Sequence, residues 1–158
     1  MMGFSILEIV VGIAVISMAM FGFMIGARNM LRISNNTGFE TQSSFLLEGG
    51  IESLRAIRDE DWTLLDGVAR DTWLYIDNDL ALIENWISPV PAGILPAGFS
   101  RRFKAFDVMR DANDDIVESG GVLDTETLRF VVEVSWKNAG SIDITRSAET
   151  YLTNFFGE

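Results

Sequence analysis

The sequence predicts an α+β protein, in which a long N-terminal α-helix is followed by a head built on an antiparallel β-sheet. Two observations predict this class. No proline occurs before Pro89, so a helix that begins near Phe4 can continue to Arg58. Apolar and polar residues then alternate in strand-like fashion beyond Phe99. The 158 residues suffice for one modest domain with an anchoring segment, and not for two full domains.

The first part of this helix is long and apolar enough to span a membrane. Residues Ile9–Ala27 carry no charge over 19 positions, and Glu8 and Arg28 bound them. Nineteen helical residues rise ~28 Å, which is close to the ~30 Å of a bilayer core. A cleaved signal peptide is disfavoured, because no Lys or Arg precedes the run and no small-x-small site follows it. We therefore predict a retained transmembrane helix over residues 4–28.

Glu8 is a lone carboxylate inside this apolar stretch, since residues Phe4–Leu7 extend the stretch on its other side. An acidic side chain at the centre of a spanning helix costs on the order of 2.5–3.5 kcal/mol, and less near the interface. Two interpretations stay open. Glu8 reaches water among the lipid headgroups, or it pairs with a cation inside a protein assembly.

Residues 29–60 are predicted to form the outer half of the same helix. Leu47, Ile51, Leu54 and Ile57 recur at spacings of four, three and three, which places them on one face. This apolar stripe is expected to lie on the head, with charged residues on the opposite side. A continuous helix would be ~80 Å long. The segment Asn35–Gly38 is the place where the sequence allows a bend.

Residues 61–158 are predicted to form an acidic globular head. Residues Leu128–Lys137 alternate most clearly, with apolar side chains at the even positions, and this pattern is typical of a half-buried strand. The other expected parts of the head are short apolar pieces at Thr72–Ile76 and Leu80–Ile87, a loop at Ser88–Gly98, a strand at Phe99–Arg110, a turn at Asn138–Gly140 and a return strand at Ser141–Phe155.

One acidic segment of the head has oxygen ligands at alternate positions, as hard cations such as calcium require: Asp111, Asn113 and Asp115, with Glu118 nearby. The spacing is not that of an EF-hand, because Ile116 stands at the sixth position and no Glu at the twelfth. Asp and Asn are also ordinary residues of hairpin loops. A weak calcium site and a simple loop are both compatible with these residues, and no other cofactor is indicated.

Composition and charge exclude several classes of function. The chain has no His and no Cys, which removes Ser-His-Asp catalysis, disulfides and most zinc sites. The net charge is −11, and all of it lies beyond residue 58, where 19 acids face 8 bases. An acidic head repels phosphate backbones, so nucleic acid is not an expected partner. No catalytic residues are predicted, and we expect a protein that is not an enzyme.

The N-terminal residues Gly3-Phe4-Ser5-Ile6-Leu7-Glu8 resemble the processing site of type IV pilins and pseudopilins. In that family a prepilin peptidase cuts after the Gly, and the new N-terminal Phe is N-methylated. The resemblance implies cleavage after Gly3, a methylated amine on Phe4 and Glu8 as the fifth mature residue. The stretch from Leu47 to Asp59, followed by Trp62, also resembles the outer helix of prepilin-type proteins.

The resemblance implies a fold and an assembly mechanism. Residues 4–28 would form the core of a filament, the outer half of the helix would lie on the head, and the amine of Phe4 would meet Glu8 of a neighbouring copy. Many pilins have a proline near the outer end of the span. Here Gly22 and Gly26 lie in that region instead, in a GxxxG spacing that permits close contact between helices.

The function that the resemblance implies is a structural subunit of a type IV pilus or a related extracellular filament (fimbrium). Its expected partners are copies of itself and other pilins, the prepilin peptidase, the assembly platform and, before assembly, the membrane. It would occupy the inner (cytoplasmic) membrane before assembly and the cell surface afterwards. Two alternatives stay open: a minor pseudopilin of a type II secretion or DNA-uptake machine, and a single-pass anchored binding protein that does not polymerise.

Overall fold

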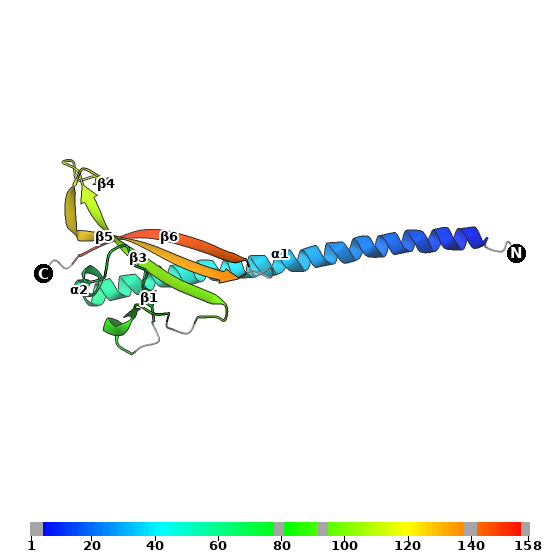
Figure 1. The fold of residues 1–158 in the computed structure, drawn as a ribbon, viewed down its shortest axis with the longest axis horizontal. Coiled ribbons are helices and arrows are strands. Elements are labelled where there is room, and N and C mark those ends of the chain that lie inside the picture. Colours follow the sequence, from blue (N-terminus) through cyan, green and yellow to red (C-terminus); the bar gives the residue numbers. More distant parts are fainter. Residues whose placement is uncertain (1–4, 78–80, 92–94, 138–141, 156–158) are drawn as a thin grey trace. The chain divides into compact units, whose positions relative to one another are not determined.

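The structure is a computed structural model that describes residues 5–77, 81–91, 95–137 and 142–155. The chain divides into two compact units, which we call the helical unit (Met1–Thr41) and the head unit (Gln42–Glu158). Helix α1 (Ile6–Glu60) contributes to both units, and the head unit adds all the other elements (Figure 1). These are α2 (Trp62–Asp66), β1 (Tyr75–Ile76), the 3₁₀ helix η1 (Ile83–Asn85), β2 (Ile87–Ser88), β3 (Phe99–Arg110), β4 (Ile116–Val117), β5 (Val122–Lys137) and β6 (Asp143–Thr153).

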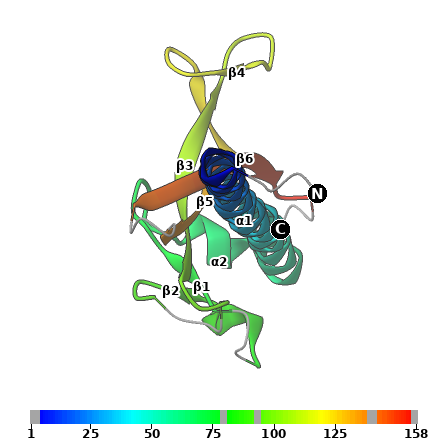
Figure 2. The same ribbon diagram turned by 90° about the vertical axis from the view of Figure 1, so that its right-hand side faces the viewer.

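The predicted α+β class is confirmed, because α1 packs on an antiparallel sheet. The main sheet has four strands in the order β4-β3-β5-β6, and β1 pairs with β2 in a separate two-stranded sheet. All the strand pairs are antiparallel. The pairing of β3 with β5 is interrupted at Asp107 and Val108, where the register shifts at a bulge. In Figure 2 the β4 end of β3 and the β1–β2 sheet lie at opposite ends of the head unit.

The core of the head unit lies between the last turns of α1 and one face of the main sheet. Leu54 and Ile57 are fully buried, and Leu47 and Ile51 pack against the same cluster, so the predicted stripe is confirmed. The alternation in β5 is also confirmed. Its buried apolar side chains are Leu128, Phe130, Val132, Val134 and Trp136, and Thr127 next to them is also buried. Phe103 of β3 packs against Phe130, with 6.1 Å between the ring centroids.

Segment Asn35–Gly38 does not interrupt the helix, since the chain is α-helical throughout this segment. Two threonine side chains bond back to the preceding turn: Thr37 Oγ1 donates to the carbonyl of Ile33 at 3.0 Å, and Thr41 Oγ1 donates to the carbonyl of Thr37 at 2.9 Å. These bonds satisfy the hydroxyl groups locally, although bonding of this kind slightly weakens a helix.

Several predicted strand boundaries are wrong. Strand β5 begins at Val122 and not at Leu128, and β4 was not expected. The first residues of β5 pair with the end of β3 beyond the bulge, where Val122 is 78% exposed. An exposed strand end has no buried face, so it leaves no alternation in the sequence. The return strand is confirmed as β6 but is shorter at both ends, and the turn expected at Asn138–Gly140 lies outside the described residues.

Gly50 lets α1 approach the sheet closely. A Cβ at this position would lie 2.8 Å from Val132 Cγ1 and 3.1 Å from Arg101 Cδ. Arg101 is itself buried, and its Nη1 donates to the carbonyl of Leu46 in α1 at 3.3 Å. Burial lowers the pKa of Arg101. The absence of a side chain at Gly50 therefore makes room for both a core valine and a buried arginine.

We expect Gly50→Ala to destabilise the protein by about 1 kcal/mol. Overpacking a rigid core costs about 1–3 kcal/mol, and the better helix propensity of alanine returns about 1 kcal/mol of this. The control is Gly38→Ala, where an added Cβ meets nothing within 4 Å and the propensity gain should raise stability. Thermal unfolding of both variants in detergent measures the difference. Equal gains in the two variants would contradict the close approach at Gly50.

Candidate membrane and assembly site

The strongest candidate site is the apolar half of α1 in the helical unit. By its length and composition this helix could cross a membrane, and its most apolar stretch of 18 residues contains no buried residue. Phe23 is 80% exposed, and large apolar side chains are exposed at 14 of the 20 positions from Ile6 to Ile25. An amphipathic surface helix carries its apolar side chains along one stripe, which faces the core. In α1 the exposed apolar side chains instead surround the helix.

Exposure on this scale is unfavourable in water. Apolar surface costs roughly 25 cal/mol per Å² when it is left in contact with water, and a full turn of large side chains exposes several hundred Å². A helix that is apolar all round is stable when lipid or protein covers it on every side. The site can therefore insert into a bilayer or pack into the centre of an assembly, and one segment can do both in succession.

Glu8 lies in the first turn of α1. The backbone N–H groups of Glu8 and Ile9 donate to the carbonyl of Ser5 at 2.9 and 3.2 Å, so the helix begins directly after Ser5. Ser5 and Glu8 have the spacing of a capping box, and a carboxylate in the first turn is favourable with the helix dipole. The structure thus adds a local role for Glu8. The predicted processing residues Gly3 and Phe4 lie outside the described residues.

Gly22 and Gly26 face open space. A Cβ built on either residue meets no atom within 4 Å, so nothing in the described part of the chain requires glycine there. Gly12 shares this property and was not singled out from the sequence. Small residues on an exposed apolar helix allow another helix to approach closely. The position of these glycines is therefore compatible with contacts to a second molecule.

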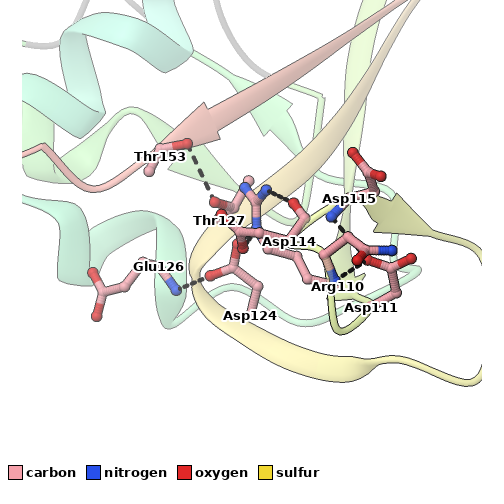
Figure 3. Close-up of polar contacts among 9 residues, drawn as sticks. Arg110, Asp111, Asp114, Asp115, Asp124, Glu126, Thr127 and Thr153 are labelled. Carbon is pink, nitrogen blue, oxygen red and sulfur yellow. Dashed lines mark hydrogen bonds and ion pairs between the residues drawn. The ribbon is translucent and has the colours of Figure 1, made fainter.

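Three of the predicted cation ligands, Asp111, Asn113 and Asp115, lie in the loop between β3 and β4 (Figure 3), whereas Glu118 directly follows β4. Asp111 Oδ1 accepts hydrogen bonds from the backbone N–H groups of Asn113 at 2.8 Å and Asp115 at 3.0 Å. Asp114 adopts a positive φ of 69°. No group of three or more His, Cys, Asp or Glu side chains that could hold a metal ion is found among the described residues. The observed geometry is that of a turn fastened by an aspartate.

Asp124 at the β3–β5 bulge was missed in the sequence, and it forms the clearest polar cluster of the head. Its Oδ2 accepts from Arg110 Nε at 2.7 Å, and its Oδ1 accepts from the backbone N–H of Glu126 at 2.9 Å (Figure 3). Burial raises the pKa of Asp124, but hydrogen bonds from Arg110, Thr127 and Glu126 outweigh burial, so the pKa lies below its ordinary value. We call Arg110 and Asp124 the bulge clamp.

We expect the head unit to lose stability in acid. Backbone hydrogen bonds from Asn113 and Asp115 lower the pKa of Asp111. The hydrogen bonds to Asp124 lower the pKa of that carboxyl group in the same way. A carboxyl group whose pKa is lower in the folded than in the unfolded protein stabilises the folded state. This contribution is complete above the unfolded-state pKa of about 3.9, and it is lost as the pH falls through the folded-state pKa. Asp124→Asn should lower Tm by several degrees at pH 7 and flatten the fall in Tm below about pH 4. An unchanged pH profile would contradict the role of the clamp.

The structure places the candidate residues in two groups. Glu8, Gly22 and Gly26 lie on the helical unit, whereas the loop residues 111–115 and the bulge clamp lie on the head unit. Within the described residues, the long run of exposed apolar side chains from Ile6 to Ile25 accompanies the first group. Comparisons with protein-family models, with curated proteins and with solved structures find no match to this chain.

Proposed function

We propose that the protein is a structural subunit of a type IV pilus or a related extracellular filament. In this proposal α1 first anchors the chain in the cytoplasmic membrane and then packs with the same helix of other copies. The observation that carries the proposal is the apolar surface all round the first half of α1, with the head unit at the other end of the chain. A lone membrane anchor needs the apolar run alone. The carboxylate of Glu8 inside the apolar run, and the glycines at open positions, support an assembling helix.

The N-terminal chemistry gives the assembly its register. Cleavage after Gly3 creates a cationic amine on Phe4, four residues before Glu8. Inside a bundle of apolar helices, an unpaired charge is costly, and an opposite charge on the next copy removes much of that cost. The pair can form at only one axial offset between copies. It therefore selects the correct offset more than it raises the affinity.

The proposal is tested by shearing the surface of cells that express the full chain and examining the sheared fraction by electron microscopy and mass spectrometry. We expect thin filaments that contain this chain as a component. A chain that stays in the membrane fraction under all conditions, with no filament in the sheared fraction, would show a single-pass anchored protein instead. The abundance of the chain in isolated filaments separates a major pilin from a minor pseudopilin.

A further inference from the structure

Two arginines of the helical unit are cations with no ion pair among the described residues. Arg28 and Arg32 are exposed and lie one turn apart, at the end of the uncharged run. The other arginines of α1 differ, because Arg55 pairs with Glu52 and Arg58 with Asp59. Three large apolar side chains accompany the exposed pair. They are Met30, Leu31 and Ile33. We call residues 28–33 the basic segment.

The head unit has a groove with the opposite character. It is lined by residues of β3, β4, β5 and β6 and by Glu118, and has a volume of about 510 Å³. Carboxylates of Asp107, Glu118 and Glu149 line it. Met109 and Tyr151 give it apolar wall area, and both are more than a third exposed. We call this feature the acidic groove.

The acidic groove keeps an excess of negative charge after its internal ion pairs are counted. Asp107 accepts from Arg70 Nε at 2.6 Å, and Glu149 pairs with Arg129 at 3.2 Å. Glu118 is exposed and forms no ion pair within the part of the chain that the structure describes. Burial, together with a hydrogen bond to Glu149, raises the pKa of Tyr151, and the charge of Glu118 acts in the same direction. The groove therefore presents a free carboxylate beside apolar walls.

We propose that the basic segment of one copy docks in the acidic groove of a second copy. This inference rests on the proposed function, because it names a contact between copies of the assembled chain. Charge complementarity supports it: residues 9–39 contain two arginines and no acidic residue, whereas the chain beyond residue 58 carries the whole net charge of −11. The apolar side chains between and beside the two arginines match the apolar walls of the groove.

The test uses the absence of cysteine in the native chain. One copy carries Leu31→Cys and a second, differently tagged copy carries Met109→Cys, and both are co-expressed as full chains. A disulfide forms only where the two Cα atoms come within about 7 Å. We expect a mixed disulfide dimer in sheared filaments after mild oxidation. The control replaces Met109→Cys with Val90→Cys, which is also exposed but lies outside the groove, and it should give no dimer.

Charge exchange makes the test specific. Arg28→Glu with Arg32→Glu should reduce the mixed dimer by about tenfold or more, because like charges then face each other. Glu118→Lys alone should also reduce it, and the combination of all three changes should restore it. Filaments that form normally but give no mixed dimer would overturn this contact and leave the proposed function standing. Absence of filaments from the unmodified chain would overturn both.

A separate binding measurement tests whether the basic segment contacts lipid instead of a second copy. Arginines at the end of a membrane span can bind the phosphates of anionic phospholipids. The measurement is binding of the purified chain to phosphatidylglycerol vesicles and to phosphatidylcholine vesicles. If Arg28→Gln with Arg32→Gln weakens binding to the first vesicle only, and the mixed dimer forms equally well without these arginines, then the pair contacts lipid and the docking proposal is wrong.

Discussion

Replacing Glu8 with alanine is expected to abolish filament assembly while the chain still inserts in the membrane. The uncharged run Ile9–Ala27 is untouched by the change, so insertion should persist. In the assembly, the amine of Phe4 would lose its carboxylate in apolar surroundings. Removing one partner of a buried ion pair costs about 3–5 kcal/mol, which corresponds to more than a hundredfold in the affinity between copies. The yield of sheared filament per membrane-bound chain measures the effect.

Glu8→Gln separates the two roles of this residue. Glutamine can still complete a capping box with Ser5, but it carries no charge. If assembly requires the ion pair between copies, Glu8→Gln should abolish filament formation, as Glu8→Ala does. If Glu8 serves only the start of the helix, Glu8→Gln should assemble normally, and the register role would be wrong. Glu48→Gln, an exposed carboxylate on the same helix, is the matched control and should assemble like the native chain.

Phe130→Ala is expected to destabilise the head unit by about 3–5 kcal/mol, as large an effect as a single truncation in this core should produce. Phe130 is fully buried, packs against Phe103 and belongs to the cluster that α1 covers. Truncation leaves a cavity that close-packed neighbours fill only in part. Tm measured in detergent should fall by more than about 10 °C.

Val122→Ala is the control for Phe130→Ala within the same strand. Val122 is exposed at the outer end of β5, and exposed substitutions usually change stability by less than about 0.5 kcal/mol. If the two variants unfold at similar temperatures, the assignment of the buried face of β5 would be wrong.

The parts of the fold that were predicted correctly have a buried face with a regular period. The stripe from Leu47 to Ile57 follows the period of a helix, and Leu128–Lys137 follows the period of a strand. In the helical segment every third or fourth residue is buried or partly buried, and in the strand every second residue is buried. The same physical constraint that buries these side chains therefore leaves a readable pattern in the sequence.

The features that were missed depend on contacts between residues far apart in the chain. The extension of β5 to Val122 is held by pairing with β3 beyond a bulge, and its side chains there are exposed. Asp124 is one of many acidic residues in the sequence, and what distinguishes it is the hydrogen bond that it accepts from Arg110. Gly50 has a purpose because Val132 and Arg101 approach it from the sheet. None of these contacts follows from local periodicity.

The apolar helix that carries the candidate residues was predicted in position, because its signal is local. An uncharged run of membrane length and the spacing of Glu8, Gly22 and Gly26 are all properties of one helix. The pairing of Glu8 with a neighbouring amine and the close approach at the glycines are contacts between molecules. They stay predictions, since a single chain defines only which surface is open.

N-terminal mass spectrometry of the chain recovered from membranes and from sheared filaments tests the central claim most directly. We predict a mature chain that begins at Phe4, carries a methyl group on its α-amine and is the same in both fractions. A chain that begins at Met1 or Met2 in sheared filaments, with no methylated Phe4, would contradict it. In that case the amine that should pair with Glu8 would not exist.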